Sequence, residues 1–213
     1  MTAPTAAHAE RASLCSLLID VGPDAPTLCE GWSTADLAAH LVVREHNVLA
    51  APGILLPGPF ARFTERTQAR TKAAHRYEDL VGRIRSGPPA LWRPFDAAAN
   101  LSEYYVHHED VRRGAGDTTP RGAEETAEVE DALWRSLQRS AGLLTRRLRA
   151  TGLDLVRDSG TVIHARKGDA LATLSGRPGE IILYLMGRKR ASHAVVAGPP
   201  AAAEALQSAP FGI

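Results

Sequence analysis

The chain has 213 residues, of which 44% are hydrophobic and 23% charged, the balance of an ordinary globular protein. Its formal net charge is only +1, which argues against a protein held on nucleic acid or an anionic membrane surface by charge. No apolar run approaches the roughly 18 residues that span a bilayer, and no secretory leader is recognisable at the N-terminus. We therefore expect a cytoplasmic protein without a nucleic-acid or membrane partner.

The chain has two cysteines, Cys15 and Cys29. They lie on separate segments and form no C-x-x-C pattern, which argues against a redox pair or a thiolate zinc site. In a cytoplasmic protein both are expected to be reduced thiols. Cys29 has two interpretations: a reactive thiol or, more commonly, a small buried hydrophobic residue.

Helical periodicity dominates the first two thirds of the chain. Apolar residues recur three and four positions apart, and glycine- and proline-rich segments such as 51–59 separate the helices. The predicted helices cover residues 5–20, 34–50, 60–86, 101–113 and 123–150. The clearest start is that of the second helix, where Ser33 is a good N-cap and Asp36 follows as in a capping box. Gly114 and Gly116 end the fourth helix, as expected of left-handed caps.

The pattern changes after Gly152. Short runs rich in valine, isoleucine and leucine predict strands, and residues 158–160 (Asp-Ser-Gly) predict a hairpin turn between the first two. The predicted strands cover residues 153–156, 161–165, 170–174 and 193–196, and the predicted helices cover 178–186 and 201–207. We therefore expect a mainly α protein with two domains, a helical bundle at 1–150 and a small α+β module at 151–213.

Glu103, His107 and His40 are the candidate metal ligands. Glu103 and His107 are four residues apart on a predicted helix, so both lie on one face, one turn apart. Imidazole nitrogen and carboxylate oxygen are standard zinc ligands. His40 is the best third candidate, because it lies mid-way along the second predicted helix beside its buried face. From spacing alone, Glu103 and His107 can equally be a surface pair, and His40 a hydrogen-bonded core histidine.

The residues around these positions resemble a known family. Residues 28–41 (LCEGWSTADLAAHL) look like the second-helix motif of the DinB/YfiT-like superfamily, and more closely like the metal-binding domain of mycothiol-dependent maleylpyruvate isomerases. Residues 100–113 (NLSEYYVHHEDVRR) are similar to that family's second ligand helix. The match is best with an actinobacterial subgroup of candidate metal-binding proteins. The resemblance implies a DinB-like helical bundle in which His40, Glu103 and His107 bind a divalent metal ion, expected to be zinc.

The resemblance also implies a function. Three protein ligands leave a fourth position open, which is the pattern of a catalytic zinc site. The resemblance implies that mycothiol, a small-molecule thiol, occupies that position as co-substrate and reacts with a small electrophile, by thiol transfer or isomerisation. One alternative is a non-catalytic metal- or ligand-binding protein of the same fold. Another is a structural dimerisation module in which the three residues only form hydrogen bonds.

The C-terminal module is covered by the resemblance as well. Residues 174–188 look like the family's small C-terminal domain, which is related to sterol-carrier folds. Here the module is short, which argues against a hydrophobic ligand tunnel. Nickel, iron or manganese would also suit a site of two histidines and a glutamate, so the metal in the cell is left open. A homodimer is left open in the same way.

Residues near the candidate ligands have expected supporting roles. His108 becomes the ligand if the helix register is shifted by one, although its i,i+5 spacing from Glu103 is poorer. Asp110 either accepts a hydrogen bond from the ligating imidazole of His107 or pairs with Arg113 at the surface.

Two arginines are candidates for binding a substrate. Arg44 lies one turn beyond His40 and is expected to hold an anionic substrate or, alternatively, to form a surface salt bridge. Arg188 follows the apolar helix of the C-terminal module and is expected to face a cleft between the domains.

Overall fold

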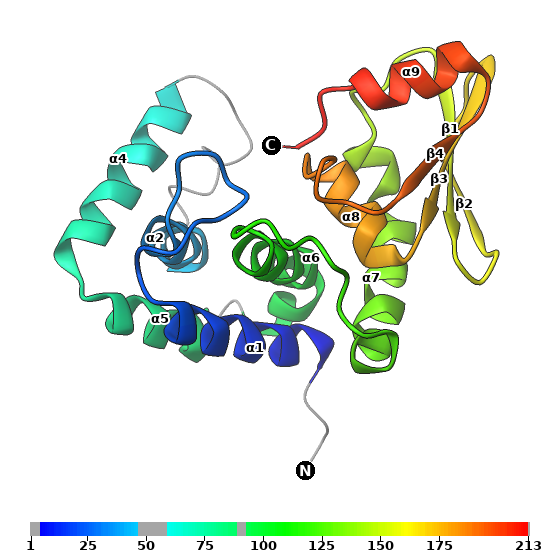
Figure 1. The fold of residues 1–213 in the computed structure, drawn as a ribbon. Helices are drawn as coiled ribbons and strands as arrows, with labels where there is room; N and C mark the ends of the chain where they lie inside the picture. The colour runs from blue at the N-terminus through cyan, green and yellow to red at the C-terminus, as the bar shows by residue number, and fades with distance from the viewer. Residues whose placement is uncertain (1–4, 47–58, 89–92, 213) are drawn as a thin grey trace. The chain divides into compact units, whose positions relative to one another are not determined.

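The structure is a computed structural model that describes residues 5–46, 59–88 and 93–212 (Figure 1). The chain forms two compact units that divide between Asp117 and Thr118. The first unit is helical, and the second combines helices with a four-stranded sheet. The expected fold class, mainly α with an α+β part at the C-terminal end, is confirmed. Within the described residues, every helix is too short or too polar to cross a membrane.

The first unit is a bundle of helices around one apolar core. Its described helices are α1 (Ala6–Val21), α2 (Thr34–His46), α4 (Pro59–Ala74), α5 (Tyr77–Ser86) and α6 (Arg93–Arg112). Helix α1 packs on α5 and α6, and α2 packs on α4 and α5. Figure 1 shows α2 and α6 almost end-on. The core is formed mainly by Leu14, Leu18, Leu37, Leu41, Leu80, Ile84 and Tyr104.

Two helix boundaries in this unit differ from the expected ones. The single helix expected over 60–86 is divided into α4 and α5, because the backbone of Arg76 is extended at the start of α5. The connector expected over 94–99 is instead helical and belongs to α6. Pro94 does not prevent this, since it stands in the first turn, where its missing N–H is not needed. The part of the second predicted helix beyond His46 lies outside the described residues.

A buried polar network links three helices of the bundle. The hydroxyl of Tyr104 on α6 accepts a hydrogen bond from Nε of Arg11 on α1 at 2.8 Å. The same hydroxyl donates to Oε1 of Glu45 on α2 at 2.5 Å. All three residues are buried, and buried polar groups are expensive to leave unpaired. The network therefore fixes how α1, α2 and α6 are placed against one another.

The segment between α1 and α2 is held against the C-terminal end of α6. The backbone amide of Leu28 donates to the carbonyl of Asp110 at 3.0 Å. A Cβ at Gly114 would lie 2.2 Å from the carbonyl oxygen of Pro26, so only glycine permits this approach. The left-handed cap expected at Gly114 is wrong, since only Gly116 of the two has a positive φ, +101°. Gly114 instead allows close packing.

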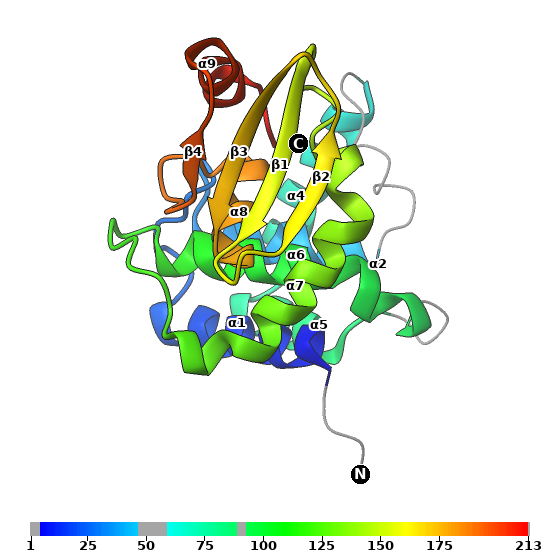
Figure 2. The ribbon, with the colours of Figure 1, turned by 90° about the vertical axis from the view of Figure 1, so that its right-hand side faces the viewer.

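The second unit is a sheet with three helices. It contains α7 (Ala123–Leu144), β1 (Thr151–Arg157), β2 (Val162–Arg166), β3 (Ala170–Gly176), α8 (Pro178–Leu185), β4 (Val195–Ala197) and α9 (Pro200–Ser208). The strand order is β2-β1-β3-β4, with β1 antiparallel to β2 and parallel to β3 (Figure 2). The expected hairpin turn is confirmed, and Gly160 has the positive φ that it needs, +85°.

Helix α7 ends earlier than expected and belongs to the second unit. It ends at Leu144 rather than at residue 150, and it packs on α8 and β2. Its apolar face includes Leu133 and Leu137, which are fully buried. The two compact units thus divide before α7, whereas the expected domain boundary follows it, and that boundary stays a prediction.

We expect Asp36→Ala to lower the free energy of unfolding by about 1 kcal/mol at neutral pH, because it removes the acceptor of the Ser33 backbone amide at the start of α2. Burial favours a higher pKa for Asp36, but hydrogen bonds from Lys72 and Ser33 outweigh it and lower the pKa. The stabilisation is therefore present above the pKa of an unfolded aspartate, about 4, and is lost as the pH falls further.

Urea denaturation at neutral and acidic pH measures this difference. Asp20→Ala, which removes an exposed carboxylate on α1, is the control and should change stability little. An equal loss for Asp36→Ala at both pH values would contradict the assignment.

Candidate metal centre

His40, Glu103 and His107 lie together in the first unit, where α2 faces α6. One potential ligand atom of each residue lies within 4.8 Å of those of the other two. Nε2 of His107 is 3.6 Å from Oε2 of Glu103. The rings of His40 and His107 meet edge to face with their centroids 5.3 Å apart. The structure thus brings together the three residues that the sequence singled out.

Both ring nitrogens of His107 face acidic groups. Nε2 faces Glu103, and Nδ1 lies 2.9 Å from Oδ2 of Asp110, whose carboxylate is fully buried. Burial alone would lower the pKa of His107, but contacts with Asp110, Cys29 and Glu103 raise it well above its ordinary value. The two carboxylates therefore favour the protonated form of the imidazole.

The neighbours of Glu103 favour its ionised form. Burial alone would raise its pKa, but His107, Arg44 and His40 lower it to about 2. Nε of Arg44 lies 3.4 Å from Oε2 of Glu103, and its guanidinium also donates to the side-chain oxygen of Asn100. A permanent carboxylate beside two imidazoles is a donor set suited to a divalent cation.

Residues on two other segments contact His40. The side-chain nitrogen of Gln68 on α4 is 2.8 Å from Nδ1 of His40, and the indole of Trp32 lies with its centroid 5.2 Å from the imidazole. The two ends of an amide have the same size, so the Gln68 side chain can also turn its oxygen towards Nδ1. In that orientation Nδ1 donates to Gln68, and Nε2 keeps its lone pair for a ligand.

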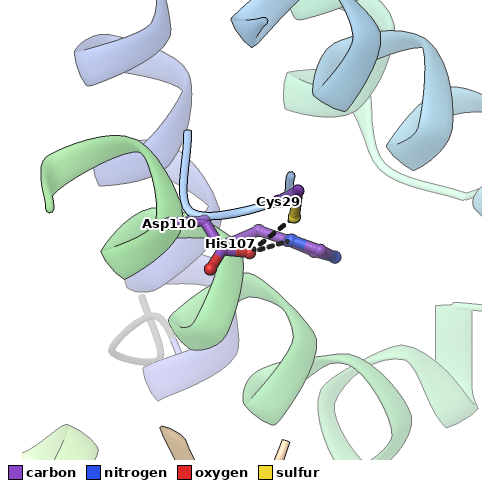
Figure 3. A group of neighbouring side chains, drawn as sticks. All are labelled: Cys29, His107 and Asp110. Carbon is purple, nitrogen blue, oxygen red and sulfur yellow. Dashed lines mark hydrogen bonds and ion pairs between the residues drawn. The ribbon is translucent and has the colours of Figure 1, made fainter. Parts of the chain in front are cut away.

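Cys29 is a site residue that the sequence did not identify. Its Sγ lies 3.2 Å from Oδ2 of Asp110, and Cys29, His107 and Asp110 form a second group of potential ligands whose atoms lie within 4.8 Å of one another (Figure 3). The interpretation of Cys29 as a small buried hydrophobic residue is therefore wrong, because its thiol contacts polar groups. No spacing rule could find this contact, since the two segments are far apart in the chain.

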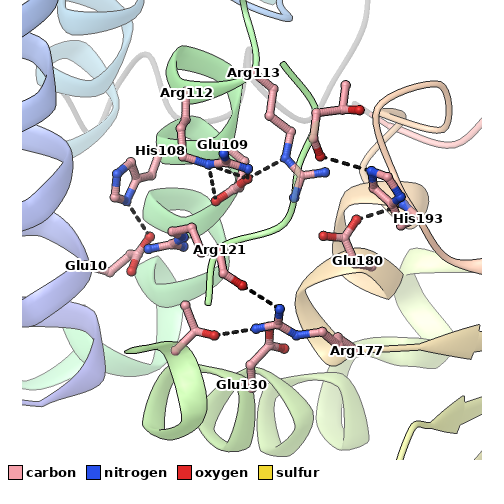
Figure 4. A network of polar contacts seen from close by, with 12 residues as sticks. Glu10, His108, Glu109, Arg112, Arg113, Arg121, Glu130, Arg177, Glu180 and His193 are labelled. Carbon is pink, nitrogen blue, oxygen red and sulfur yellow. Dashed lines mark hydrogen bonds and ion pairs between the residues drawn. The ribbon is translucent and has the colours of Figure 1, made fainter. Parts of the chain in front are cut away.

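His108, the alternative metal ligand, and Arg113, the alternative partner of Asp110, both contact other residues. Nδ1 of His108 lies 2.7 Å from Oε1 of Glu10 on α1, away from the three candidate ligands. Arg113 pairs with Glu109 (Figure 4). Asp110 is thus a buried partner of His107, not a surface carboxylate.

The two candidate substrate arginines are in different units. Arg44 lies at the metal-ligand group and is half-buried. Arg188 lies in the second unit, where its guanidinium donates to the carbonyl of Met186 at the end of α8 at 2.6 Å. The same unit has its own ion pair, in which the partly buried Arg177 contacts the buried Glu130 (Figure 4). A substrate-binding role for Arg44 and Arg188 stays a prediction.

The helical unit that brings two histidines and a glutamate together is similar to a known domain. Residues 5–99 match the family model described as mycothiol maleylpyruvate isomerase N-terminal domain. This region, less than half of the chain, is therefore similar to that domain. The matched region includes His40 and ends before Glu103.

The chain is also similar to a solved structure, a crystal structure of the mycothiol-dependent maleylpyruvate isomerase. The alignment covers 90% of each of the two chains, with a TM-score of 0.57 and 18% sequence identity. At that identity the likeness shows a shared fold alone. No curated protein matches the chain.

We expect Asp110→Asn to lower the pKa of His107 in chelator-treated protein, because the amide removes the negative charge but can still accept a hydrogen bond. The raised pKa of His107 stabilises the fold below the pKa of an unfolded histidine, about 6.5, and this stabilisation is lost as the pH rises through the folded value. The difference in unfolding free energy between the two proteins should therefore be largest near pH 6 and shrink as the pH rises.

NMR titration of the histidine side chains and urea denaturation measure the two effects. Asp154→Asn is the matched control, because Asp154 contacts the exposed His164. This variant should change neither the titration of His107 nor the free energy of unfolding by much. An unchanged titration of His107 in Asp110→Asn would show that Asp110 does not control its charge.

Proposed function

We propose that His40, Glu103 and His107 bind one divalent metal ion, expected to be zinc, and that a small-molecule thiol such as mycothiol reacts beside it with a small electrophile. The observation that carries the proposal is the convergence of three potential ligand atoms within 4.8 Å of one another, on two helices of the bundle. The reaction would be a thiol transfer or an isomerisation through a thiol adduct. The match of residues 5–99 to the mycothiol maleylpyruvate isomerase N-terminal domain model supports the choice of thiol.

The donor set fits zinc. Zinc takes imidazole nitrogens and carboxylate oxygens at about 2.0–2.2 Å in a tetrahedral arrangement, which puts neighbouring donor atoms roughly 3.4 Å apart. Nε2 of His107 and Oε2 of Glu103 are 3.6 Å apart already. Behind the ligands, Asp110 and Gln68 contact the second ring nitrogens of the two histidines. Such partners fix the ring orientation and the tautomer of ligating histidines.

The charges of the site favour an anionic fourth ligand. One carboxylate and two neutral imidazoles leave a divalent ion with a net charge of about +1 in a buried place, which a thiolate would neutralise. When bound, the ion would lower the pKa of a thiol and stabilise the thiolate as a nucleophile. Asp110 keeps the His107 proton on Nδ1, and Glu103 remains ionised. Arg44, beside Glu103, is the cation that would hold a carboxylate of the electrophile.

We expect His40→Ala and Glu103→Gln to lose the metal that the wild-type protein retains in stoichiometric amount after zinc loading and dialysis. Each variant removes one of three protein ligands, and Glu103→Gln keeps the size of the side chain while removing its charge. Elemental analysis measures the zinc content. His164→Ala, at an exposed histidine of β2, is the control and should retain the metal. Equal zinc in His40→Ala and wild type would disprove the centre.

We expect cobalt-loaded protein to change its visible spectrum when mycothiol or a surrogate thiol is added, because the thiol enters the open coordination position. The same additions to cobalt-treated His40→Ala should produce no change. Zinc-loaded protein should then show thiol-dependent turnover against a panel of small unsaturated electrophiles, some with a carboxylate. Thiol binding without turnover would support a non-catalytic metal- and thiol-binding protein. No spectral change would remove the thiol from the proposal.

A further inference from the structure

We propose a second metal position in the first unit, on the Nδ1 side of His107, formed by Cys29, Asp110 and His107 and selective for thiophilic ions such as cadmium or copper(I). It shares His107 with the position formed by His40 and Glu103, so a chain fills one position or the other. This inference uses the same histidine as the proposed function but does not depend on a thiol reaction.

The geometry of the three residues suits a metal ion. Oδ2 of Asp110 is 2.9 Å from Nδ1 of His107 and 3.2 Å from Sγ of Cys29, hydrogen-bond distances that would widen when an ion enters between the three atoms. Sγ and the two other potential ligand atoms lie within 4.8 Å of one another. Figure 3 shows the thiol and the carboxylate converging on one side of the imidazole. His107 and Asp110 are buried, and Cys29 is partly exposed, which gives an ion a path from solvent.

The fold holds the thiol in this place. The backbone of Leu28, the preceding residue, donates to the carbonyl of Asp110 at 3.0 Å. The amide of Cys29 donates to Oγ1 of Thr27 at 3.2 Å, and its carbonyl accepts from the amide of Trp32 at 2.9 Å. Gly114 lets this segment approach the end of α6. Cys29 is therefore fixed beside Asp110 before any ion arrives, which lowers the entropy cost of binding.

The ligand chemistry separates the two positions. A thiolate binds cadmium and copper(I) more strongly than imidazole and carboxylate do, and it also binds zinc, whereas imidazole and carboxylate without a thiolate suit zinc and other first-row ions. On the Cys29 side, one thiolate and one carboxylate neutralise a divalent ion fully in its buried place. On the His40 side, one carboxylate leaves a net positive charge and thus room for an anionic ligand from outside. The ligands of the Cys29 position therefore suit a site that retains an ion. They do not favour the binding of a further anionic ligand such as a substrate thiolate.

The proton balance makes the two positions exclude each other. An ion that binds Sγ of Cys29 and Nδ1 of His107 releases the thiol proton and the Nδ1 proton of the protonated imidazole to solvent. The ion also takes the lone pair of Nδ1 of His107, so the single remaining ring proton must be on Nε2, facing Glu103 at 3.6 Å. An Nε2 that carries a proton has no lone pair for the other position. His107 thus acts as a switch between a zinc-type ion and a thiophilic one.

Cadmium titration of the chelator-treated protein tests the proposal, because cadmium bound to a thiolate absorbs in the near ultraviolet. The wild type and His40→Ala should both gain this band with one equivalent of cadmium. Cys29→Ser should lose it while retaining zinc bound through His40. Cys15→Ala, at the other cysteine, which lies in the bundle core, is the matched control and should keep the band. Circular dichroism confirms that each variant is folded.

The outcomes separate this proposal from the first. Cadmium binding without the band in the wild type, or a band that persists in Cys29→Ser, would overturn the Cys29 position. So would a band that disappears in His40→Ala, since cadmium would then occupy the His40 position. A wild type that gains the band but never retains zinc would instead overturn the proposed function and leave this position intact. Adding cadmium to zinc-loaded wild type should release the zinc, and simultaneous retention of both ions would contradict the switch at His107.

Discussion

The buried imidazole of His107 is the interaction on which the rest of the candidate centre depends. Glu103 faces one of its ring nitrogens and Asp110 the other. Because His107 and Asp110 are buried, each carboxylate influences which nitrogen carries the proton and which can bind a metal. A solvent-exposed histidine with the same neighbours would be far less constrained, because water screens the charges.

The bundle supports this arrangement from a distance. The network of Arg11, Tyr104 and Glu45 joins α1, α2 and α6 in the core, one position along α6 from Glu103. The same helices carry the candidate ligands, so core packing and ligand geometry are set together. Buried polar networks of this kind specify one arrangement of helices when all their members are paired. Helix α6 thus serves two purposes. Tyr104 joins the polar network of the core, and Glu103 and His107 provide candidate metal ligands.

Much of the bundle could be predicted from the sequence, because helical periodicity and capping are local. The i,i+4 spacing of Glu103 and His107 puts both on one face in any helix, and the capping box at Ser33 fixes where α2 begins. The contact of Cys29 with Asp110 could not be predicted, since it depends on how a loop packs on a distant helix. For the same reason Gly114 was interpreted as a cap, although it permits the approach of Pro26. The split between α4 and α5 was missed because no proline or glycine marks it.

An anomalous-scattering map of crystals loaded with one equivalent of zinc tests the central claim most directly. We expect one strong peak in the first unit, coordinated by Nε2 of His40, Nε2 of His107 and a carboxylate oxygen of Glu103 at about 2.0–2.2 Å, with a further position open to solvent or thiol. Asp110 should contact Nδ1 of His107 without reaching the ion. No ordered peak, or a zinc peak whose ligands do not include His40 and Glu103, would contradict the account.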